Sequence, residues 1–296
     1  MISICIPVYN YDCNPLLEQL IEQTAQLFLP YEIIVFNDAS KKEFVPHEST
    51  LVSIINSTEN LGRNKAREEL ALAAKFDNLI FLDADVYLPD NKFLERYESC
   101  ISNSYDIIYG GVAYSKNVPE QAYLLRWTYG SKRESRPVEK RKKDVYQNLI
   151  SMGFMIKKDA FLKISTAISG NYYGHDIVFS YRINFLNYQI THIENPIIHK
   201  GLEPTLVYLY KSIEAINTTF HSERVGLIPD DFRPVQRAYL KIKKTGAIKL
   251  FIKVMDKTKA VLDKNLRSRK PKLICLDLLK LYHYSLLKQA NKQTPQ

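Results

Sequence analysis

The strongest constraint on the fold is the alternation of short apolar runs with amphipathic stretches along the first 82 residues. Runs rich in Ile, Val, Phe and Leu predict strands, and stretches with apolar residues at helical spacing predict helices. The expected strands are 2–7, 31–36, 51–55 and 79–82, and the expected helices are 15–28 and 64–76. Strands that alternate with helices favour a mostly parallel sheet with right-handed connections. The expected fold class is therefore α/β, with a Rossmann-like central sheet flanked by helices.

An acidic pair follows the last of these expected strands. Asp83 and Asp85 come directly after the apolar run 79–82, so they lie at the carboxyl edge of a buried strand, where open α/β sheets bind ligands. Side chains two apart on an extended segment point the same way, and hard divalent cations prefer carboxylate oxygen. The pair therefore predicts a Mg²⁺ or Mn²⁺ site that can carry a diphosphate, although Asp-x-Asp alone is also a common surface turn.

Five short motifs give this acidic pair its context. They read ICIPVYN at 4–10, EIIVFNDAS at 32–40, NLGRNKAR at 60–67, LDAD at 82–85 and GHDIVFSYR at 174–182. In this order they resemble the family 2 glycosyltransferases of the GT-A fold. The resemblance covers about residues 1–205, with a nucleotide-sugar half at about 1–110 and an acceptor half at about 111–205. Residues 206–296 are expected to form a basic helical extension.

The resemblance implies a nucleotide site at the carboxyl edge of the sheet. Asp38 matches the aspartate that accepts the N3 proton of uracil, which requires an oxygen acceptor, so a UDP-sugar is the expected donor. Pro7 and Tyr9 match the residues beside the base, where an aromatic face can pack on the ring. Asn37 and Ala39 depart from the aspartate and glycine common at these positions, so an altered base or ribose contact stays open.

The same resemblance implies the phosphate and metal contacts. Asp85 matches the direct ligand of a cation that bridges both phosphates, and Asp83 matches a residue that reaches the ribose or the water shell of the metal. His199 completes the metal shell in some relatives, and a structural histidine or one beside the diphosphate is equally open. Of the three basic residues at 63, 65 and 67, Arg63 is the candidate for holding phosphate or base. Most of this group is expected to face solvent.

Asp176 matches the general base of an inverting transfer, which takes the proton of the attacking acceptor hydroxyl. An N-cap for an expected helix at 177–186 is the alternative role. His175 stands where the family usually has a glutamate and is placed on the acceptor side. Trp127 is also assigned to the acceptor side, because the block 125–134 is shared with a branch of surface-polysaccharide transferases.

The stretch 131–144 contains seven Lys and Arg and three acids. Such a run is predicted to stay unburied as a mobile basic loop. Two roles stay open for this segment: a lid that closes over the donor, and an exposed linker.

Composition limits the class of protein further. The chain has 296 residues and is 46% hydrophobic, which is enough for a sizeable core. Its four cysteines have neither disulfide-framework nor zinc-site spacing, so a reducing cytoplasm is expected. No targeting segment or run long enough to span a bilayer is visible. The expected location is cytoplasmic, with peripheral association at the inner face of the membrane left open.

Positive charge is concentrated near the C-terminus. Residues 233–272 carry fourteen Lys and Arg and two acids, a balance of +12, whereas the whole chain has a net charge of +9. Stretches 247–255 and 273–287 combine helical apolar spacing with lysines, which is typical of helices lying on anionic lipid. Packing of these helices on the rest of the protein is the alternative. Nucleic acid is not an expected partner, because no recognition motif accompanies the charge.

Together with these patterns, the resemblance implies a metal-dependent, inverting hexosyl or N-acetylhexosaminyl transferase that acts on a glycan or lipid-linked acceptor in surface-polysaccharide synthesis. A non-catalytic GT-A relic that uses its basic tail to bind membrane or nucleic acid is the alternative. Nucleotidyl transfer is disfavoured, because no Gly-rich phosphate loop follows the first strand.

Overall fold

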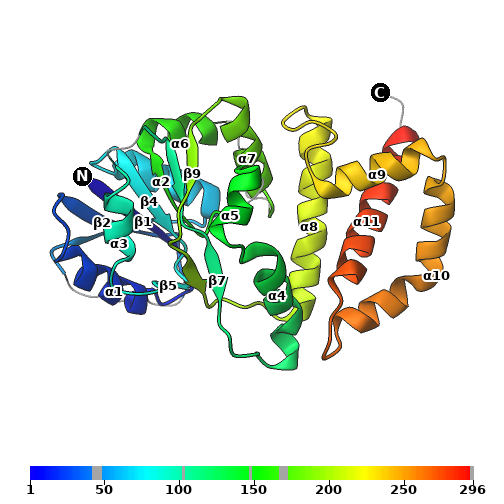
Figure 1. Cartoon of the computed structure of the whole chain (residues 1–296), viewed down its shortest axis with the longest axis horizontal. Helices are drawn as coiled ribbons and strands as arrows, with labels where there is room; N and C mark the ends of the chain where they lie inside the picture. Colours follow the sequence, from blue (N-terminus) through cyan, green and yellow to red (C-terminus); the bar gives the residue numbers. More distant parts are fainter. Residues whose placement is uncertain (42–48, 102–103, 147–148, 167–172, 294–296) are drawn as a thin grey trace. The chain divides into compact units, whose positions relative to one another are not determined.

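The computed structural model describes residues 1–41, 49–101, 104–146, 149–166 and 173–293 (Figure 1). The chain divides into two compact units. The first comprises Met1–Ser115, Arg133–Asn171 and Arg182–Gly201, and the second comprises Lys116–Lys132, Tyr172–Tyr181 and Leu202–Gln296. The second unit thus takes two segments from the region that the sequence assigned to the catalytic domain at 1–205.

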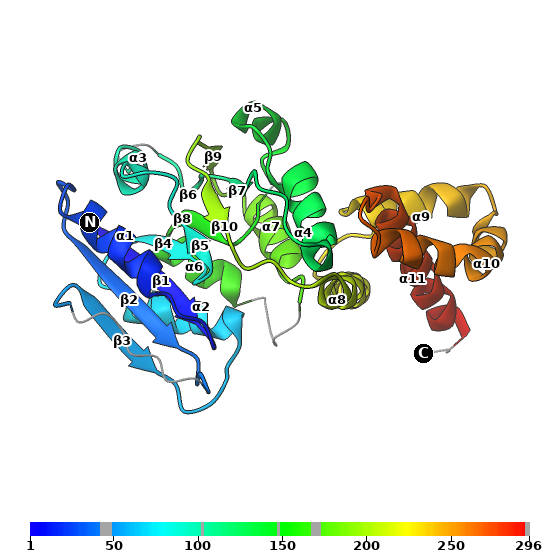
Figure 2. The same cartoon turned by 90° about the horizontal axis from the view of Figure 1, so that it is seen from below.

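The first unit is built on a mostly parallel sheet. Within the described ranges, seven strands lie in the order β3-β2-β1-β4-β8-β6-β9, and Figure 2 shows β3, β2 and β1 side by side. Their bounds are β1 Ile2–Val8, β2 Tyr31–Asn37, β3 Val52–Asn56, β4 Asn78–Leu82, β6 Ile107–Tyr109, β8 Gly153–Lys157 and β9 Ile190–His192. Of these strands, β8 runs antiparallel to both of its neighbours. The α/β class and the mostly parallel sheet predicted from the sequence are confirmed.

Helices cover both faces of this sheet. On one face, α1 (Asn14–Thr24) and α3 (Phe93–Glu98) share a buried core with the alternate residues of β1, namely Ile2, Ile4, Ile6 and Val8. On the other face, α2 (Arg63–Ala73) and α6 (Lys158–Ser165) pack, and Phe161 of α6 lies 4.5 Å from Phe81 between ring centroids. Burying both faces explains why β4 is buried along its whole length and is apolar after Asn78.

A small second sheet continues the first unit. Among the described residues it has three strands in the order β5-β10-β7, with bounds Val86–Tyr87, Ile197–His199 and Val112–Tyr114. Strand β10 is parallel to β7 and antiparallel to β5. Because β5 begins directly after Asp85, this sheet brings His199 to the acidic pair.

The second unit is helical. It contains α4 (Leu124–Tyr129), α8 (Thr205–Arg224), α9 (Pro234–Lys244), α10 (Ile248–Leu266), α11 (Leu273–Gln293) and the start of α7 (Asp176–Phe185). Helix α11 packs against α8, α9 and α10. None of the helices in the described part of the chain combines the length and apolar content needed to cross a bilayer.

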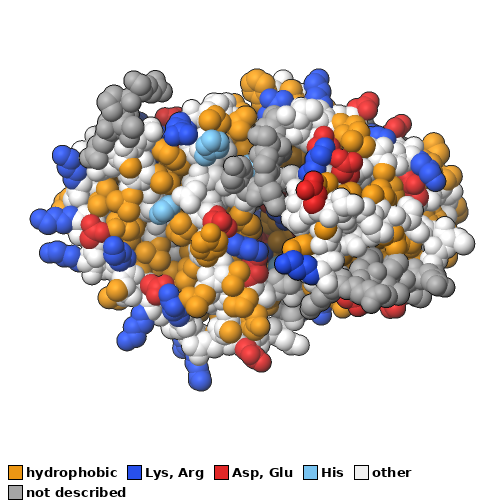
Figure 3. Space-filling model, turned by 180° about the vertical axis from the view of Figure 1, so that it is seen from behind, with side chains coloured by type: hydrophobic (Ala, Val, Ile, Leu, Met, Phe, Trp, Pro, Cys, Tyr) orange, Lys and Arg blue, Asp and Glu red, His pale blue; other side chains and the backbone are white. Residues whose placement is uncertain are grey.

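Helix α10 buries one face and exposes another. Ile248 and Leu266 are buried in cores shared with α11, and Met255 is also buried, so part of the apolar spacing in 247–255 serves internal packing. Leu250, Val254 and Val261 remain exposed, by 64%, 49% and 68%. Figure 3 shows Lys and Arg side chains projecting at the end of the second unit where α10 lies, with hydrophobic side chains between them.

The basic segment, residues 131–144, is not an unburied loop. It contains helical turns and the short helix α5 (Val138–Arg141). Arg141 is 2% exposed and hydrogen-bonds to backbone carbonyls of the sheet. The prediction that this run stays unburied is therefore wrong for Arg141, whose guanidinium is satisfied by these backbone acceptors and also lies 3.7 Å from the Glu194 carboxylate.

Candidate donor site

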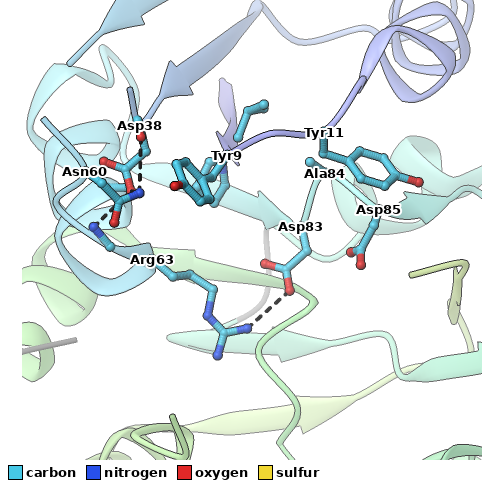
Figure 4. A pocket seen from close by; sticks show the side chains of 12 residues that line it. Tyr9, Tyr11, Asp38, Asn60, Arg63, Asp83, Ala84 and Asp85 are labelled. Atoms are coloured by element: carbon cyan, nitrogen blue, oxygen red, sulfur yellow. Dashed lines mark hydrogen bonds and ion pairs between the residues drawn. The ribbon is translucent and has the colours of Figure 1, made fainter. Parts of the chain in front are cut away.

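A pocket of about 400 Å³ opens at the carboxyl ends of β1, β2 and β4. Its lining includes every residue that the sequence assigned to the donor, together with Asp85. The lining residues are Pro7, Val8, Tyr9, Tyr11, Asp38, Asn60, Gly62, Arg63, Ala66, Asp83, Ala84 and Asp85. Figure 4 shows the carboxylates of Asp83 and Asp85 on one side and that of Asp38 on the other, with Tyr9 between them.

Asp38 organises one wall of this pocket. Its buried carboxylate accepts hydrogen bonds from the backbone N–H groups of Leu61 (2.7 Å) and Gly62 (2.9 Å) and from the amide of Asn60 (3.1 Å) (Figure 4). Gly62 has a φ of +82° at the start of α2, a conformation that favours glycine. Asp38 therefore fixes the loop that begins α2, and its contact with a uracil ring stays a prediction.

The departures at Asn37 and Ala39 have local structural consequences. The Asn37 amide donates to Asn56 at 3.0 Å and accepts from the backbone N–H of Ser40 at 3.1 Å. An ionised aspartate could not donate the first of these bonds. Ala39 has a φ of +54°, which is costly for a residue with a Cβ and explains why glycine suits this position.

Two arginines from one face of α2 hold Asp83. Arg67 donates to Asp83 Oδ1 at 2.6 Å, and Arg63 reaches Oδ2 at 3.4 Å. Arg67 is 4% exposed and also bonds the carbonyl oxygen of Ser151. Lys65 instead faces solvent beside Glu68 and Glu69. The expectation that most of this basic group faces solvent is wrong for Arg67, whose spacing of four from Arg63 places both on one helix face.

Asp85 is held by the small sheet. His199 Nε2 lies 3.3 Å from Asp85 Oδ2, and the backbone N–H of Lys200 donates to the Asp85 carbonyl. A Cβ on Gly201 would lie 1.7 Å from Asp85 Oδ2, so the carboxylate fills the space that any other residue would need. Burial raises the pKa of Asp85, but the hydrogen bond and charge of His199 and the charge of Arg63 outweigh it. The pKa is lowered overall, and the carboxylate is ionised at neutral pH.

The pair of Asp85 and His199 fits a divalent cation. Two ligand atoms that each lie about 2.1 Å from one ion, at right angles to each other, are about 3 Å apart. This is close to the 3.3 Å that separates His199 Nε2 from Asp85 Oδ2. Among the described residues, no three His, Cys, Asp or Glu side chains meet as a metal cluster, and Asp83 contacts two arginines. A cation here would take its other ligands from diphosphate and water, as Mg²⁺ usually does.

The residues assigned to acceptor and catalysis belong to the second unit. Asp176 is the first residue of α7, where negative charge is favourable. The carbonyl of buried His175 accepts the N–H groups of Val178 and Phe179. Burial lowers the pKa of Arg233, and the charges of Tyr129 and Asp176 oppose this shift, so Asp176 has a cation nearby. Trp127 is half-buried on α4. The catalytic and acceptor roles of these residues stay predictions.

Sequence reasoning missed four residues of the donor pocket and its support. Asn60 and Tyr11 line the pocket, Arg67 anchors Asp83, and Gly201 makes room for Asp85. The spacing of Arg67 from Arg63 is a signal that could have identified it. The need for glycine at position 201 depends on a contact between residues far apart in the chain, which local patterns do not reveal.

Two curated relatives match part of the chain. An uncharacterised glycosyltransferase from Haemophilus influenzae is 36% identical over 95 residues, which covers 30% of this chain and 31% of that protein. A second, from Synechocystis, is 31% identical over 121 residues and 36% of each chain. The matched region is thus about a third of the length of these relatives.

The fold is similar to that of solved glycosyltransferases. A mannosyltransferase from Pyrobaculum calidifontis superposes with a TM-score of 0.51 at 14% identity, over 99% of this chain and 88% of that one. The model of the family described as "Glycosyl transferase family 2" matches residues 3–165, more than half of the chain. With the GT-A architecture and the motif order, this match shows that the chain belongs to glycosyl transferase family 2.

Proposed function

We propose that this protein transfers a sugar from a nucleoside diphosphate sugar to a hydroxyl group of a saccharide acceptor. The observation that carries the proposal is the pocket at the carboxyl edge of the sheet, where Tyr9, Arg63 and Asp85 line one cavity. Its aromatic side chains suit a base, its arginine suits phosphate, and its carboxylates suit a cation.

The proposed donor is a UDP-sugar. Among the described residues, one carboxylate oxygen of Asp38 accepts a hydrogen bond only from the backbone N–H of Leu61, and such an oxygen can accept a second from the N3–H of uracil. Pro7 and Tyr9 would lie beside the base. The Pyrobaculum mannosyltransferase was solved in complex with GDP-Man and Mn²⁺, which supports a nucleoside diphosphate donor. Binding measurements with UDP and GDP distinguish between the two bases.

A divalent cation, Mn²⁺ or Mg²⁺, is proposed at Asp85 and His199, with Asp83 on the side of the ribose. When bound, such an ion offsets the negative charge that develops on the departing diphosphate. Arg63 would contribute further positive charge toward the same phosphates. Asp85 is ionised at neutral pH because His199 and Arg63 lower its pKa despite burial, so it is in the form that binds a cation.

Asp176 is proposed as the general base of an inverting transfer. The acceptor oxygen forms a bond to the anomeric carbon as its proton passes to the Asp176 carboxylate. The bond from that carbon to the diphosphate oxygen breaks on the opposite face, and the nucleoside diphosphate leaves. Positive charge from Arg233 in the same unit favours the ionised carboxylate that this step needs. His175 and Trp127 are proposed to contact the acceptor.

The acceptor is proposed to be a glycan or a lipid-linked saccharide in surface-polysaccharide synthesis, and the sugar a hexosyl or N-acetylhexosaminyl group. The proposed location is the cytoplasm, with contact to the inner face of the membrane. The exposed face of α10 supports that contact, because Leu250, Val254 and Val261 lie beside four exposed lysines. These are Lys249, Lys253, Lys257 and Lys264. Lysines alone would suit nucleic acid equally, but exposed apolar side chains gain only from lipid.

Two variants separate donor binding from transfer. Asp176→Asn should keep metal-dependent binding of the donor nucleotide and lose sugar transfer by at least about 100-fold, because the proton acceptor is removed. Asp85→Ala should lose both, because the cation loses its carboxylate. Calorimetric titration with UDP measures binding, and release of UDP from a panel of UDP-sugars measures turnover. Equal loss of binding in both variants would show that Asp176 is structural and would contradict its assignment as the base.

A further inference from the structure

Two stretches of the first unit, residues 107–114 and 190–199, run side by side through both of its sheets. Strands β6 and β9 pair in parallel in the seven-stranded sheet, and β7 and β10 pair in parallel in the three-stranded sheet. His199 ends β10 and pairs with Tyr114, which ends β7. The point at which both stretches pass from one sheet to the other therefore determines where His199 lies relative to Asp85.

Arg141 occupies this crossover. Its guanidinium donates hydrogen bonds to the carbonyl oxygens of Tyr109 (3.1 Å), Gly110 (3.1 Å) and Ile193 (2.9 Å). Tyr109 and Gly110 belong to the stretch that leads into β7, and Ile193 belongs to the stretch that leads into β10. Buried carbonyl groups require such donors where strand pairing changes. A single side chain from the basic segment thus links both stretches where they pass from one sheet to the other.

The backbone at the crossover is shaped around this arginine. Gly111 has a φ of +100°, and a Cβ there would lie 3.0 Å from the guanidinium carbon of Arg141. A Cβ on the neighbouring Gly110 would lie 2.2 Å from the carbonyl oxygen of Asn195. The Gly-Gly pair therefore lets the two stretches approach each other and leaves room for the arginine.

The basic segment also holds the end of β7. Glu134 accepts a hydrogen bond from the Tyr114 hydroxyl. The Tyr114 ring in turn packs against the His199 imidazole, with ring centroids 5.5 Å apart and an interplanar angle of 75°. Arg141 and Glu134, seven residues apart, thus act on the same strand pair, one at its start and one at its end.

The imidazole of His199 is oriented in an unusual way for a cation ligand. Its Nε2 faces Asp85, while its Nδ1 is buried and has no hydrogen-bond partner among the described residues. Histidines that bind metals almost always donate a hydrogen bond from the second nitrogen, which fixes the ring. At His199 the packing of Tyr114 and the register of β10 take over that role.

We propose that Arg141, Glu134 and Tyr114 are positioning residues that set the imidazole of His199 beside Asp85 for a divalent cation. The proposal rests on the proposed function, since it assumes that this pair binds the cation. The basic segment then acts as a brace for the phosphate end of the donor site.

Metal affinity tests the brace directly. Titration of Mn²⁺ into UDP-saturated protein should show affinity about 10- to 100-fold weaker in Tyr114→Leu and Arg141→Met, the loss typical when support of a metal ligand is removed. Tyr114→Phe keeps the ring but loses the hydrogen bond to Glu134, so its affinity should lie between those of Tyr114→Leu and the unmodified protein. Lys140→Met, which changes the exposed neighbour of Arg141, should match the unmodified protein. Unchanged Mn²⁺ affinity in Tyr114→Leu and Arg141→Met would overturn the proposal.

Histidine NMR provides a readout that needs no metal. The protein has six histidines, and the ring signals of His199 are identified by their loss in His199→Gln. In metal-free protein these signals should move in Tyr114→Leu and in Glu134→Leu, which removes the acceptor of the Tyr114 hydroxyl, and stay in place in Lys140→Met. Unmoved signals would overturn the positioning role even if the Arg141 variant does not fold. Failure of the unmodified protein to bind UDP with Mn²⁺, with the His199 signals still moving, would instead contradict the proposed function.

Discussion

At the scale of single residues, contacts distinguish Asp83 and Asp38, whose carboxylates hold the surrounding structure, from Asp85, whose carboxylate can bind a cation. Asp83 is held by Arg67 and Arg63, and both oxygens of Asp38 receive hydrogen bonds from the loop at 60–62. Asp85 is paired with His199, lines the pocket, and occupies space that any side chain at Gly201 would need. Of the three aspartates, Asp85 is therefore the one whose carboxylate is best placed to bind a cation.

Arg67→Met tests the support of Asp83. The substitution removes the guanidinium that bonds Asp83 and Ser151 in a buried setting, and it leaves the longer contact of 3.4 Å between the carboxylate and Arg63. Breaking a buried ion pair on one side typically costs about 3 kcal/mol of unfolding free energy. Urea denaturation measures the change, and Lys65→Met is the matched control because Lys65 is exposed on the same helix. A loss no greater than that of the control would contradict the structural role.

At the scale of elements, the first four strands and the two helices between them were predictable, because apolar periodicity and strand-end polar residues are local signals. The motif order placed Asp38, Asp83 and Asp85 at one edge for the same reason. The contacts of Arg141 and Gly201 were not predictable, since each depends on residues far away in the sequence. Charge runs suggest exposure, yet the backbone carbonyls of two distant strands satisfy Arg141.

His192 makes the stability of the crossover depend on pH. Burial lowers its pKa to about 4 from 6.5, and its ring nitrogens contact the carbonyl of Val145 and the guanidinium of Arg141. The folded protein therefore binds a proton at His192 less readily than the unfolded chain does. The unfolding free energy should fall by about 3 kcal/mol from this group as the pH drops from about 6.5 to about 4.

His192→Gln should flatten this part of the pH profile, as measured by urea denaturation across the same range. His221→Gln, at an exposed position on α8, should leave the profile unchanged. A His192→Gln profile as steep as that of the unmodified protein would show that other groups cause the acid sensitivity.

At the scale of the whole molecule, the chain combines a donor unit with a basic helical unit. The apolar residues for which the sequence left both a lipid surface and internal packing open are largely used for packing among α8, α9, α10 and α11. What remains exposed on α10 is a narrower stripe, Leu250, Val254 and Val261, flanked by lysines. The proposed membrane contact therefore depends on the face of α10 opposite to its buried one.

Vesicle co-sedimentation tests this contact. The intact protein should sediment with phosphatidylglycerol-containing vesicles and much less with pure phosphatidylcholine, because lysines are attracted to anionic lipid. Replacing Leu250, Val254 and Val261 together by Gln should abolish sedimentation without affecting nucleotide binding. Replacing the similarly exposed Leu72, Val118 and Val225 by Gln serves as the control. Equal sedimentation of both triple variants would contradict insertion through α10.

The central claim is a metal-dependent nucleotide site at the carboxyl edge of the sheet, and calorimetric titration with UDP and GDP, each with and without Mn²⁺, tests it most directly. The account predicts that UDP binds in the presence of Mn²⁺, binds at least about tenfold more weakly without it, and no longer responds to Mn²⁺ in Asp85→Ala. Preference for GDP would correct the base while keeping the site. Binding of neither nucleotide, with or without Mn²⁺, would contradict the account and favour a non-catalytic relic.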